Sequence, residues 1–155
     1  MTIQVPETLL VSGQKINMHT CPLTNYFQLT ERFFEFQAPR STMLYRGYVG
    51  TWELIDQRLY LKNIISFGNP VTLQDIFKNC GEMVFAHWLS RNTLASFGKS
   101  KYEDSLREFV ANYKLELKFN KGVLIGAKLT DNFAGLIEKN FSRILEMIHT
   151  KANDQ

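Results

Sequence analysis

The sequence predicts an α+β fold, in which a hairpin-rich antiparallel sheet packs against a few helices, including an amphipathic helix at the C-terminus. Three observations predict it. Residues 45–64 have the composition of two β-strands joined by the polar connection Asp56-Gln57-Arg58. Residues 113–129 alternate apolar and polar side chains around Asn120-Lys121-Gly122, which indicates a second hairpin. Residues 131–151 repeat apolar side chains at helical spacing.

The N-terminal region predicts a hairpin followed by a helix. Residues 8–18 contain two short strands around Gly13, a residue that adopts the positive φ of a tight turn without strain. Apolar side chains recur at helical spacing over residues 23–33. Pro39 and the polar residues after it then break the chain before the central hairpin.

A short helix is predicted after the central hairpin. Thr72 stands at an N-cap position, and Asp75 follows three residues later, as in a capping box. Gly81 is placed to end this helix, because glycine commonly follows the last helical turn. The apolar side chains between these positions form the inner face.

Two further elements are predicted before the second hairpin. The apolar residues 83–89 indicate a strand that turns at residues 90–92 and returns through residues 93–97. Residues 102–111 carry mixed charges among apolar side chains three or four positions apart, a spacing that favours a helix.

The C-terminal helix is predicted over residues 131–151, with Thr130 at the N-cap position. Its apolar residues fall on one face, so another part of the protein must cover that face. These residues are Phe133, Ile137, Phe141, Ile144 and Ile148.

The composition is that of one folded domain spanning residues 1–155, since 45% of the residues are hydrophobic and 21% are charged. The N-terminus lacks the pattern of a secretory signal, and no apolar run is long enough to span a membrane. We therefore expect a cytoplasmic protein without a membrane segment, in which Cys21 and Cys80 are reduced. The net charge of +3 is spread along the chain and is uninformative by itself, but the chain lacks the run of basic residues that would mark a nucleic-acid partner, and we do not expect one.

The chain shows no motif for a catalytic nucleophile or a cofactor. It has neither a Gly-x-Ser-x-Gly elbow nor a glycine-rich phosphate loop. His19 and Cys21 are too few for a metal site, which needs three or four ligands. We expect no metal and no cofactor, and no enzymatic activity is predicted from the motifs.

The leading functional hypothesis is a non-enzymatic protein-interaction module with a protein partner, such as an accessory, antitoxin or immunity component of a bacterial toxin or defence system. Aromatic and arginine side chains supply the binding energy of many interfaces. An exposed edge strand or the C-terminal helix could also pair with a second copy of the chain, so a homodimer is possible. The candidate binding residues are Arg46, Tyr48, Trp52, Tyr60 and Trp88.

Three alternatives stay open from the sequence. The first is a small-molecule or nucleotide sensor whose pocket is lined by Trp52, Tyr60, Phe85 and Trp88. The second is an enzyme that uses Glu53, His87 or Arg46 in a site assembled from distant residues. The third is a single-strand nucleic-acid platform, for which Arg46, Tyr48, Trp52, Tyr60 and Lys62 supply the residue types.

Three segments carry a recognisable pattern: Arg46-Gly-Tyr-Val-Gly-Thr-Trp-Glu53, Leu59-Tyr-Leu61 and Val84-Phe-Ala-His-Trp-Leu-Ser90. The pattern resembles a group of small uncharacterised bacterial proteins that share an Arg-Gly-Tyr-x-Gly-Thr-Trp-Glu hairpin and a Val-Phe-Ala-x-Trp strand. The resemblance implies a bacterial, cytosolic protein and no particular activity. Residues 99–108 diverge from this group, so any function they carry would be particular to this protein.

Gly50-Thr-Trp52 also resembles the Gly-x-Trp motif that lipocalins and fatty-acid-binding proteins carry on an early strand of a ligand-holding barrel. In those families the motif is followed by seven or more consecutive strands. The helices predicted here over residues 72–80 and 131–151 interrupt the strand series, so a tryptophan packed in the core is the simpler interpretation.

Overall fold

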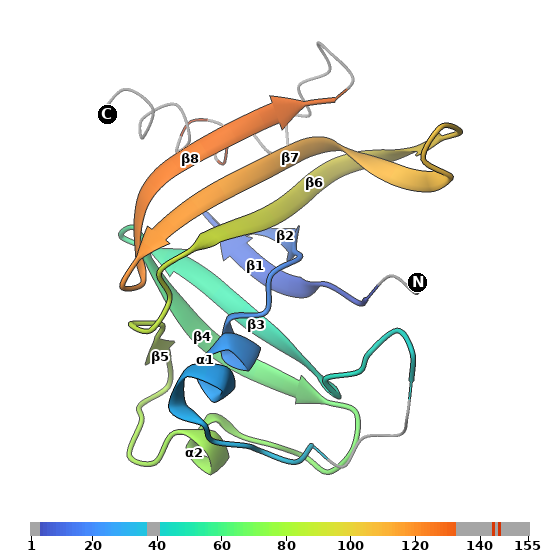
Figure 1. The fold of residues 1–155 in the computed structure, drawn as a ribbon. Coiled ribbons are helices and arrows are strands. Elements are labelled where there is room, and N and C mark those ends of the chain that lie inside the picture. The colour runs from blue at the N-terminus through green and yellow to red at the C-terminus, as the bar shows by residue number, and fades with distance from the viewer. Residues whose placement is uncertain (1–3, 37–40, 133–143, 145, 147–155) are drawn as a thin grey trace.

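The structure is a computed structural model, and it describes residues 4–36, 41–132, 144 and 146. In these residues the chain is nearly all β, because eight strands form one mixed sheet and the two helices before residue 132 are short (Figure 1). The prediction of an α+β fold is therefore wrong. In chain order the elements are β1 (Glu7–Val11), β2 (Gln14–Met18), α1 (Pro22–Thr30), β3 (Tyr48–Ile55), β4 (Arg58–Ser66), α2 (Leu73–Ile76), β5 (Val84–Phe85), β6 (Asn92–Glu103), β7 (Glu108–Asn120) and β8 (Val123–Asp131).

The sheet closes on itself. Its strands follow the order β3-β1-β2-β6-β7-β8-β4-β5, and β3 also pairs with β4, so seven strands form a ring. β1 runs parallel to β3, which makes the sheet mixed rather than antiparallel. The contact that closes the ring is narrow: Arg58 of β4 pairs with Val123 of β8, and the Leu59 N–H donates to the Gly122 carbonyl at 3.0 Å.

The three hairpins predicted from the sequence are confirmed. Each closes through two residues with positive φ, which are Ser12-Gly13 between β1 and β2, Asp56-Gln57 between β3 and β4, and Lys121-Gly122 between β7 and β8. Turns of this kind match the right-handed twist of paired strands, so the local sequence is enough to specify them.

The helix predicted over residues 23–33 is confirmed but is shorter than expected. α1 begins at Pro22, whose fixed φ suits the first turn of a helix. It ends at Thr30, because Glu31 adopts the left-handed conformation with φ 55°. The side chains of Leu23 and Tyr26 are buried beneath it.

The capping pair predicted for α2 is present, since the Thr72 N–H donates to the Asp75 carboxylate at 2.8 Å. The helix nevertheless ends at Ile76, so Gly81 does not end it. Phe77 already has an extended backbone, and its ring stacks on Trp88 with centroids 5.7 Å apart. Packing against a distant residue therefore limits this helix to about one turn.

The strand pair predicted over residues 83–97 is wrong. Within residues 83–89, Val84 and Phe85 alone form a strand, and this strand pairs with β4 rather than with β6. The chain turns directly afterwards, where the Leu89 N–H donates to the Ala86 carbonyl at 3.1 Å. β6 pairs instead with β2 and β7.

The helix predicted over residues 102–111 is also wrong, because these residues form the end of β6, a turn and the start of β7. In the turn, the Leu106 N–H donates to the Glu103 carbonyl at 3.2 Å. Apolar residues three and four positions apart suit a helix, but the same residues lie here on a hairpin without a buried face. No regular alternation was therefore available to reveal the strands.

The predicted C-terminal helix lies outside the described residues, except for Ile144 and Glu146, which are helical. Ile144 is fully buried and belongs to the core cluster. Thr130, predicted as the N-cap, lies in β8 instead. Among the described residues, no helix combines the length and the apolar character that crossing a membrane requires.

Candidate interaction site

The distal part of the β6–β7 hairpin, residues 98–111, projects from the sheet, and we call it the arm (Figure 1). β2 pairs with β6 nearer the start of that strand, and β8 pairs with β7 from Tyr113 onward, so the described strands do not flank the arm. A register shift between Phe97 and Ser100, with Gly98 at φ 88°, marks its base. Irregularities of this kind bend a strand and change the direction of its side chains.

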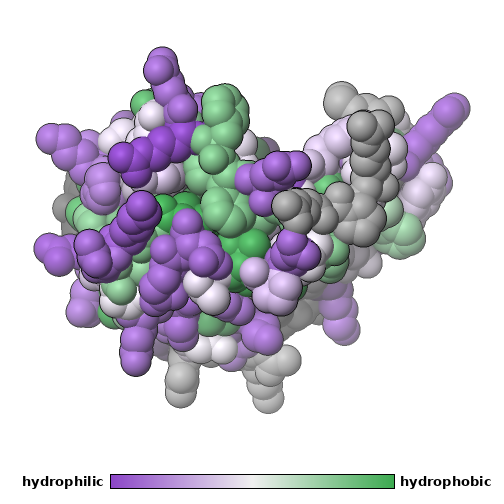
Figure 2. Space-filling model, turned by 90° about the horizontal axis from the view of Figure 1, so that it is seen from below, coloured by the Kyte–Doolittle hydropathy of each residue, from purple (hydrophilic) through white to green (hydrophobic). Residues whose placement is uncertain are grey.

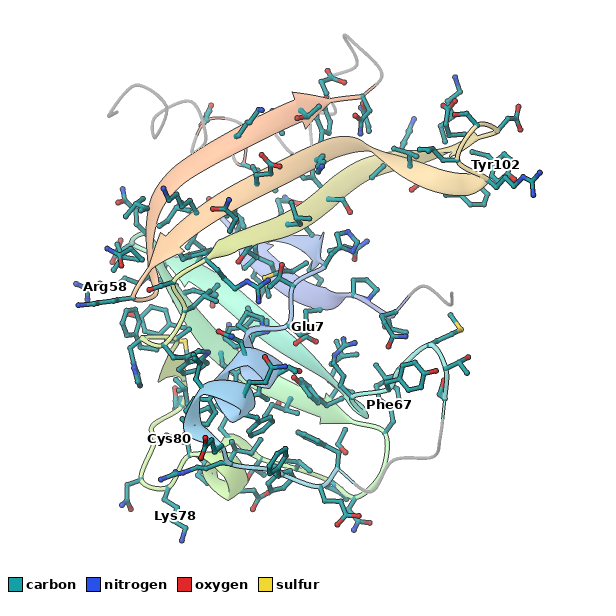
Figure 3. All side chains as sticks on the ribbon, viewed as in Figure 1. Glu7, Arg58, Phe67, Lys78, Cys80 and Tyr102 are labelled. Atoms are coloured by element: carbon teal, nitrogen blue, oxygen red, sulfur yellow. The ribbon has the colours of Figure 1, made fainter. Side chains whose placement is uncertain are left out.

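The arm exposes three large apolar side chains. The exposed fractions are 48% for Tyr102, 60% for Leu106 and 72% for Phe109. Tyr102 and Phe109 are cross-strand partners, and their rings meet edge to face with centroids 5.4 Å apart. Tyr102 lies far from the buried Glu7 at the centre of the molecule (Figure 3). The arm thus presents an apolar surface that contributes little to the core.

A groove of about 510 Å³ lies at the base of the arm, and we call it the arm groove. The N-terminal residues 4 and 6, β2, β6 and β7 contribute to its walls. Its volume falls in the range of about 300–1,000 Å³ that is usual for ligand pockets. Leu94 and Phe109 are apolar residues of its wall, and Asn17, His19, Ser96 and Lys114 are polar ones.

His19, directly after β2, and Ser96 on β6 are joined by a hydrogen bond, with 2.7 Å between His19 Nε2 and Ser96 Oγ. Partial burial of the ring lowers the pKa of His19 below its ordinary value, although the residue keeps exposed surface. The imidazole is therefore neutral near pH 7, where it can either donate or accept this hydrogen bond. The pair supplies polar groups with a fixed position to the wall of the arm groove.

Acidification should destabilise the wild type more than a His19→Gln variant. Because folding lowers the pKa of His19, the unfolded chain binds the proton more tightly than the folded chain. The contribution of neutral His19 to the stability of the folded chain is fully present above the ordinary pKa of about 6.5. It is lost as the pH falls through the lowered pKa of the folded chain. Urea unfolding of both proteins at about pH 7.5 and about pH 5 measures this difference. If the difference in stability between the wild type and His19→Gln is the same at both pH values, the lowered pKa assigned to His19 is contradicted.

Three of the residues predicted for binding are buried together around Glu7. Arg46 donates to the Glu7 carboxylate at 3.0 Å and lies over the ring of Tyr48, and Trp52 Nε1 donates to Glu7 at 3.4 Å. The backbone N–H of Gly50 also donates to this carboxylate. Burial raises the pKa of Glu7, while Arg46 and the Gly50 N–H act in the opposite direction. The cluster holds the fold together and is not presented at the surface.

Trp88 joins this cluster, since its ring centroid lies 6.4 Å from that of Trp52. Tyr60 does not, because its cross-strand partner is Glu53, and consecutive strand residues such as Trp52 and Glu53 point to opposite faces. Tyr60 packs instead against Phe85, with centroids 5.6 Å apart. The pocket predicted from these four aromatic residues is therefore not formed.

The other predicted combinations are not assembled either. Glu53 forms an ion pair with Lys62 at 2.9 Å on the outer face, whereas Arg46 is buried beside Glu7 and His87 is exposed. The residues expected for a nucleic-acid platform are divided in the same way. Arg46, Tyr48 and Trp52 lie in the buried cluster around Glu7, whereas Tyr60 and Lys62 lie on the outer face with Glu53. In the part of the chain that the structure describes, no three His, Cys, Asp or Glu residues are grouped to hold a metal ion.

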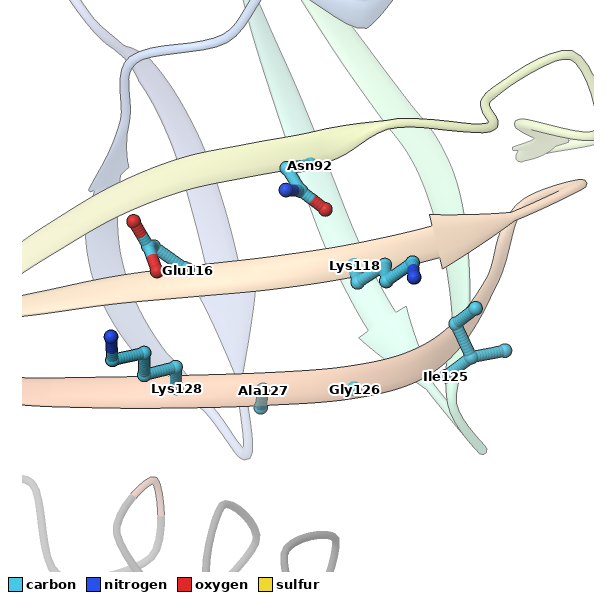
Figure 4. A pocket seen from close by; sticks show the side chains of 7 residues that line it. All are labelled: Asn92, Glu116, Lys118, Ile125, Gly126, Ala127 and Lys128. Atoms are coloured by element: carbon cyan, nitrogen blue, oxygen red, sulfur yellow. The ribbon is translucent and has the colours of Figure 1, made fainter. Parts of the chain in front are cut away.

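Two of the other depressions among the described residues lie away from the arm. One, of about 320 Å³, lies on the outer face of β7 and β8, where Glu116, Lys118 and Lys128 contribute to its lining (Figure 4). The other, of about 490 Å³, lies between α1 and α2. Figure 2 shows the underside of the molecule, where hydrophilic side chains surround apolar surface. The residues lining the second depression are Tyr26, Arg32, Ile76, Phe77 and Lys78.

Sequence reasoning missed both the arm and the arm groove. The available signal for the arm was Asp104-Ser105, two residues that favour turns, placed between Tyr102 and Phe109. The groove gave no local signal, because the residues that line it come from distant parts of the chain: the N-terminal residues 4 and 6, β2 and the residue after it, β6, β7 and Asn132. No protein-family model matches the chain, and neither a curated protein nor a solved structure matches it.

Proposed function

We propose that the protein is a protein-interaction module whose contact surface is formed by the arm and the arm groove. The observation that carries this proposal is the exposure of Tyr102, Leu106 and Phe109 on a hairpin that projects from the sheet. Apolar groups gathered on one exposed surface are typical of interaction sites. Aromatic residues are also enriched at the centres of interfaces. The adjoining groove adds hydrogen-bonding groups to the apolar surface.

Other exposed aromatic residues lend less support. Phe33 and Tyr45 are exposed, but each lies close in sequence to residues 37–40, which are outside the described part of the chain. Phe67 is 52% exposed on the loop after β4, and it lies far from Tyr102 (Figure 3). Phe67 therefore provides a matched control, similar in chemistry and exposure but distant from the arm.

The test compares three tagged proteins as bait in a lysate of the native host: the wild type, an arm variant carrying Leu106→Ser and Phe109→Ser, and Phe67→Ser. We expect the wild type and Phe67→Ser to retain a partner in a stoichiometric amount. The arm variant should bind it about a hundredfold more weakly, since two interface anchors contribute roughly 3 kcal/mol together. Mass spectrometry of the partner then tests whether it belongs to a toxin or defence system.

Circular dichroism and thermal unfolding of the arm variant serve as the folding control, and both should match the wild type because the substituted side chains are exposed. Equal retention by all three baits would show that the partner does not use the arm. A wild type that retains no protein would overturn the proposal itself.

A further inference from the structure

We infer that the arm groove receives an extended segment of the partner and that an acidic group on this segment pairs with Lys114. This inference rests on the proposed function, and it specifies the chemistry of the partner at one position. It follows from the charge of the groove, from the environment of Lys114 and from the arrangement of polar groups across three strands.

The described residues that line the arm groove include a lysine but no carboxylate. Near neutral pH the ring of His19 is uncharged, so the positive charge of the groove comes from Lys114. The remaining polar side chains of the wall are amides and hydroxyls. A negatively charged group entering the groove would therefore meet attraction from Lys114 without competing repulsion from the described residues of the wall.

Lys114 is exposed and forms neither an ion pair nor a hydrogen bond with the described residues. Its cross-strand partners are Ser96 on β6 and Thr130 on β8, both neutral. The acidic residue two positions along β7 is Glu116, which lies outside the groove and is paired across the strands with Lys128. Among the described residues, nothing pairs with the ammonium group of Lys114, so that group can meet a partner.

The polar groups form a row across the sheet. Asn17 is the cross-strand partner of Ser96, and Ser96 is the partner of Lys114, so the row crosses β2, β6 and β7. Neighbouring strands lie roughly 4.8 Å apart, so the row is about 10 Å long, which an extended segment of about three residues would span. Phe109 and Leu94, on the apolar wall, can contact an apolar side chain next to the acidic one.

The test uses a phage-displayed library of short random peptides, selected separately on the wild type, on Lys114→Glu and on Lys118→Glu. Lys118 lies on the same strand as Lys114 and, four positions along it, on the same outer face. It lines the depression of Figure 4 and not the arm groove, so it controls for a general change in charge. We expect the wild type and Lys118→Glu to select peptides with Asp or Glu beside an apolar residue. Lys114→Glu should select Lys or Arg at that position instead.

An individual acidic peptide from the wild-type pool should bind Lys114→Glu about tenfold more weakly, because the substitution removes an attraction and adds a repulsion. Pools without an acidic position, or pools that are identical for wild type and Lys114→Glu, would overturn the inference. A dimer of the wild type that Lys114→Glu dissociates, seen by light scattering, would also overturn it by identifying a second copy as the occupant.

The failure of this inference is distinguishable from the failure of the proposed function. If the arm variant loses the captured partner but the peptide pools show no acidic preference, the assignment of Lys114 fails alone. If the wild type captures no partner, the proposed function fails as well.

Discussion

Replacing Glu7 with alanine is expected to lower the free energy of unfolding by about 3–5 kcal/mol. Glu7 is fully buried and accepts hydrogen bonds from the Arg46 guanidinium, the Trp52 indole and the Gly50 backbone. Without the carboxylate, these three donors lose their shared acceptor, and the Arg46 charge is left uncompensated in a buried site. Urea unfolding monitored by tryptophan fluorescence measures the change, because Trp52 lies in the same cluster.

Glu53→Ala provides the matched control for this substitution. Glu53 also pairs with a cation, Lys62, at 2.9 Å, but the side chains are 26% and 40% exposed. Exposed ion pairs contribute little, so we expect a loss below about 1 kcal/mol. Similar losses for Glu7→Ala and Glu53→Ala would contradict the conclusion that the Glu7 cluster stabilises the interior of the ring.

The second large effect is expected at Gly122, in the turn that helps to close the ring of strands. Gly122 has φ 82°, and a Cβ there would lie 2.6 Å from the Ala86 carbonyl oxygen. We expect Gly122→Ala to cost about 3–4 kcal/mol, because left-handed backbone strain and steric overlap with the backbone add together. Thermal or urea unfolding of the variant measures this cost.

Gly13→Ala separates these two contributions. Gly13 has φ 81°, nearly the same as Gly122, but a Cβ there would meet no atom within 4 Å. The free energy of unfolding of Gly13→Ala should fall by only about 1–2 kcal/mol, which is the cost of placing alanine in a left-handed backbone conformation. Equal losses at the two glycines would contradict the close contact between Gly122 and the Ala86 carbonyl.

The hairpins could be predicted from the sequence because their information is local. Each hairpin combines strand-forming residues with a short turn, and each strand pairs with the strand that follows it in the chain. The hairpins lie in residues 8–18, 45–64 and 113–129. The parallel pairing of β1 with β3 has no such signal, since residues 12–47 separate the two strands. The closure of β4 on β8 depends on one residue pair from distant parts of the chain. The ring topology therefore could not be predicted from local patterns.

The candidate site was harder to predict for a related physical reason. Arg46 and Trp52 are residue types that often anchor interfaces, but here both donate hydrogen bonds to Glu7, about forty positions earlier in the chain, and they are buried. Residue type alone does not reveal such a distant partner. The arm was mistaken for a helix because Leu106 and Phe109 lie on an exposed hairpin, where no core imposes the alternation of a strand.

The most direct test of the proposed contact surface is amide hydrogen exchange of the protein alone and in complex with the partner that it captures. The account predicts slower exchange in the complex over residues 98–111 of the arm and at the neighbouring Leu94 and Ser96, with no change around Phe67. Slower exchange around Phe67, together with an unchanged arm, would contradict it.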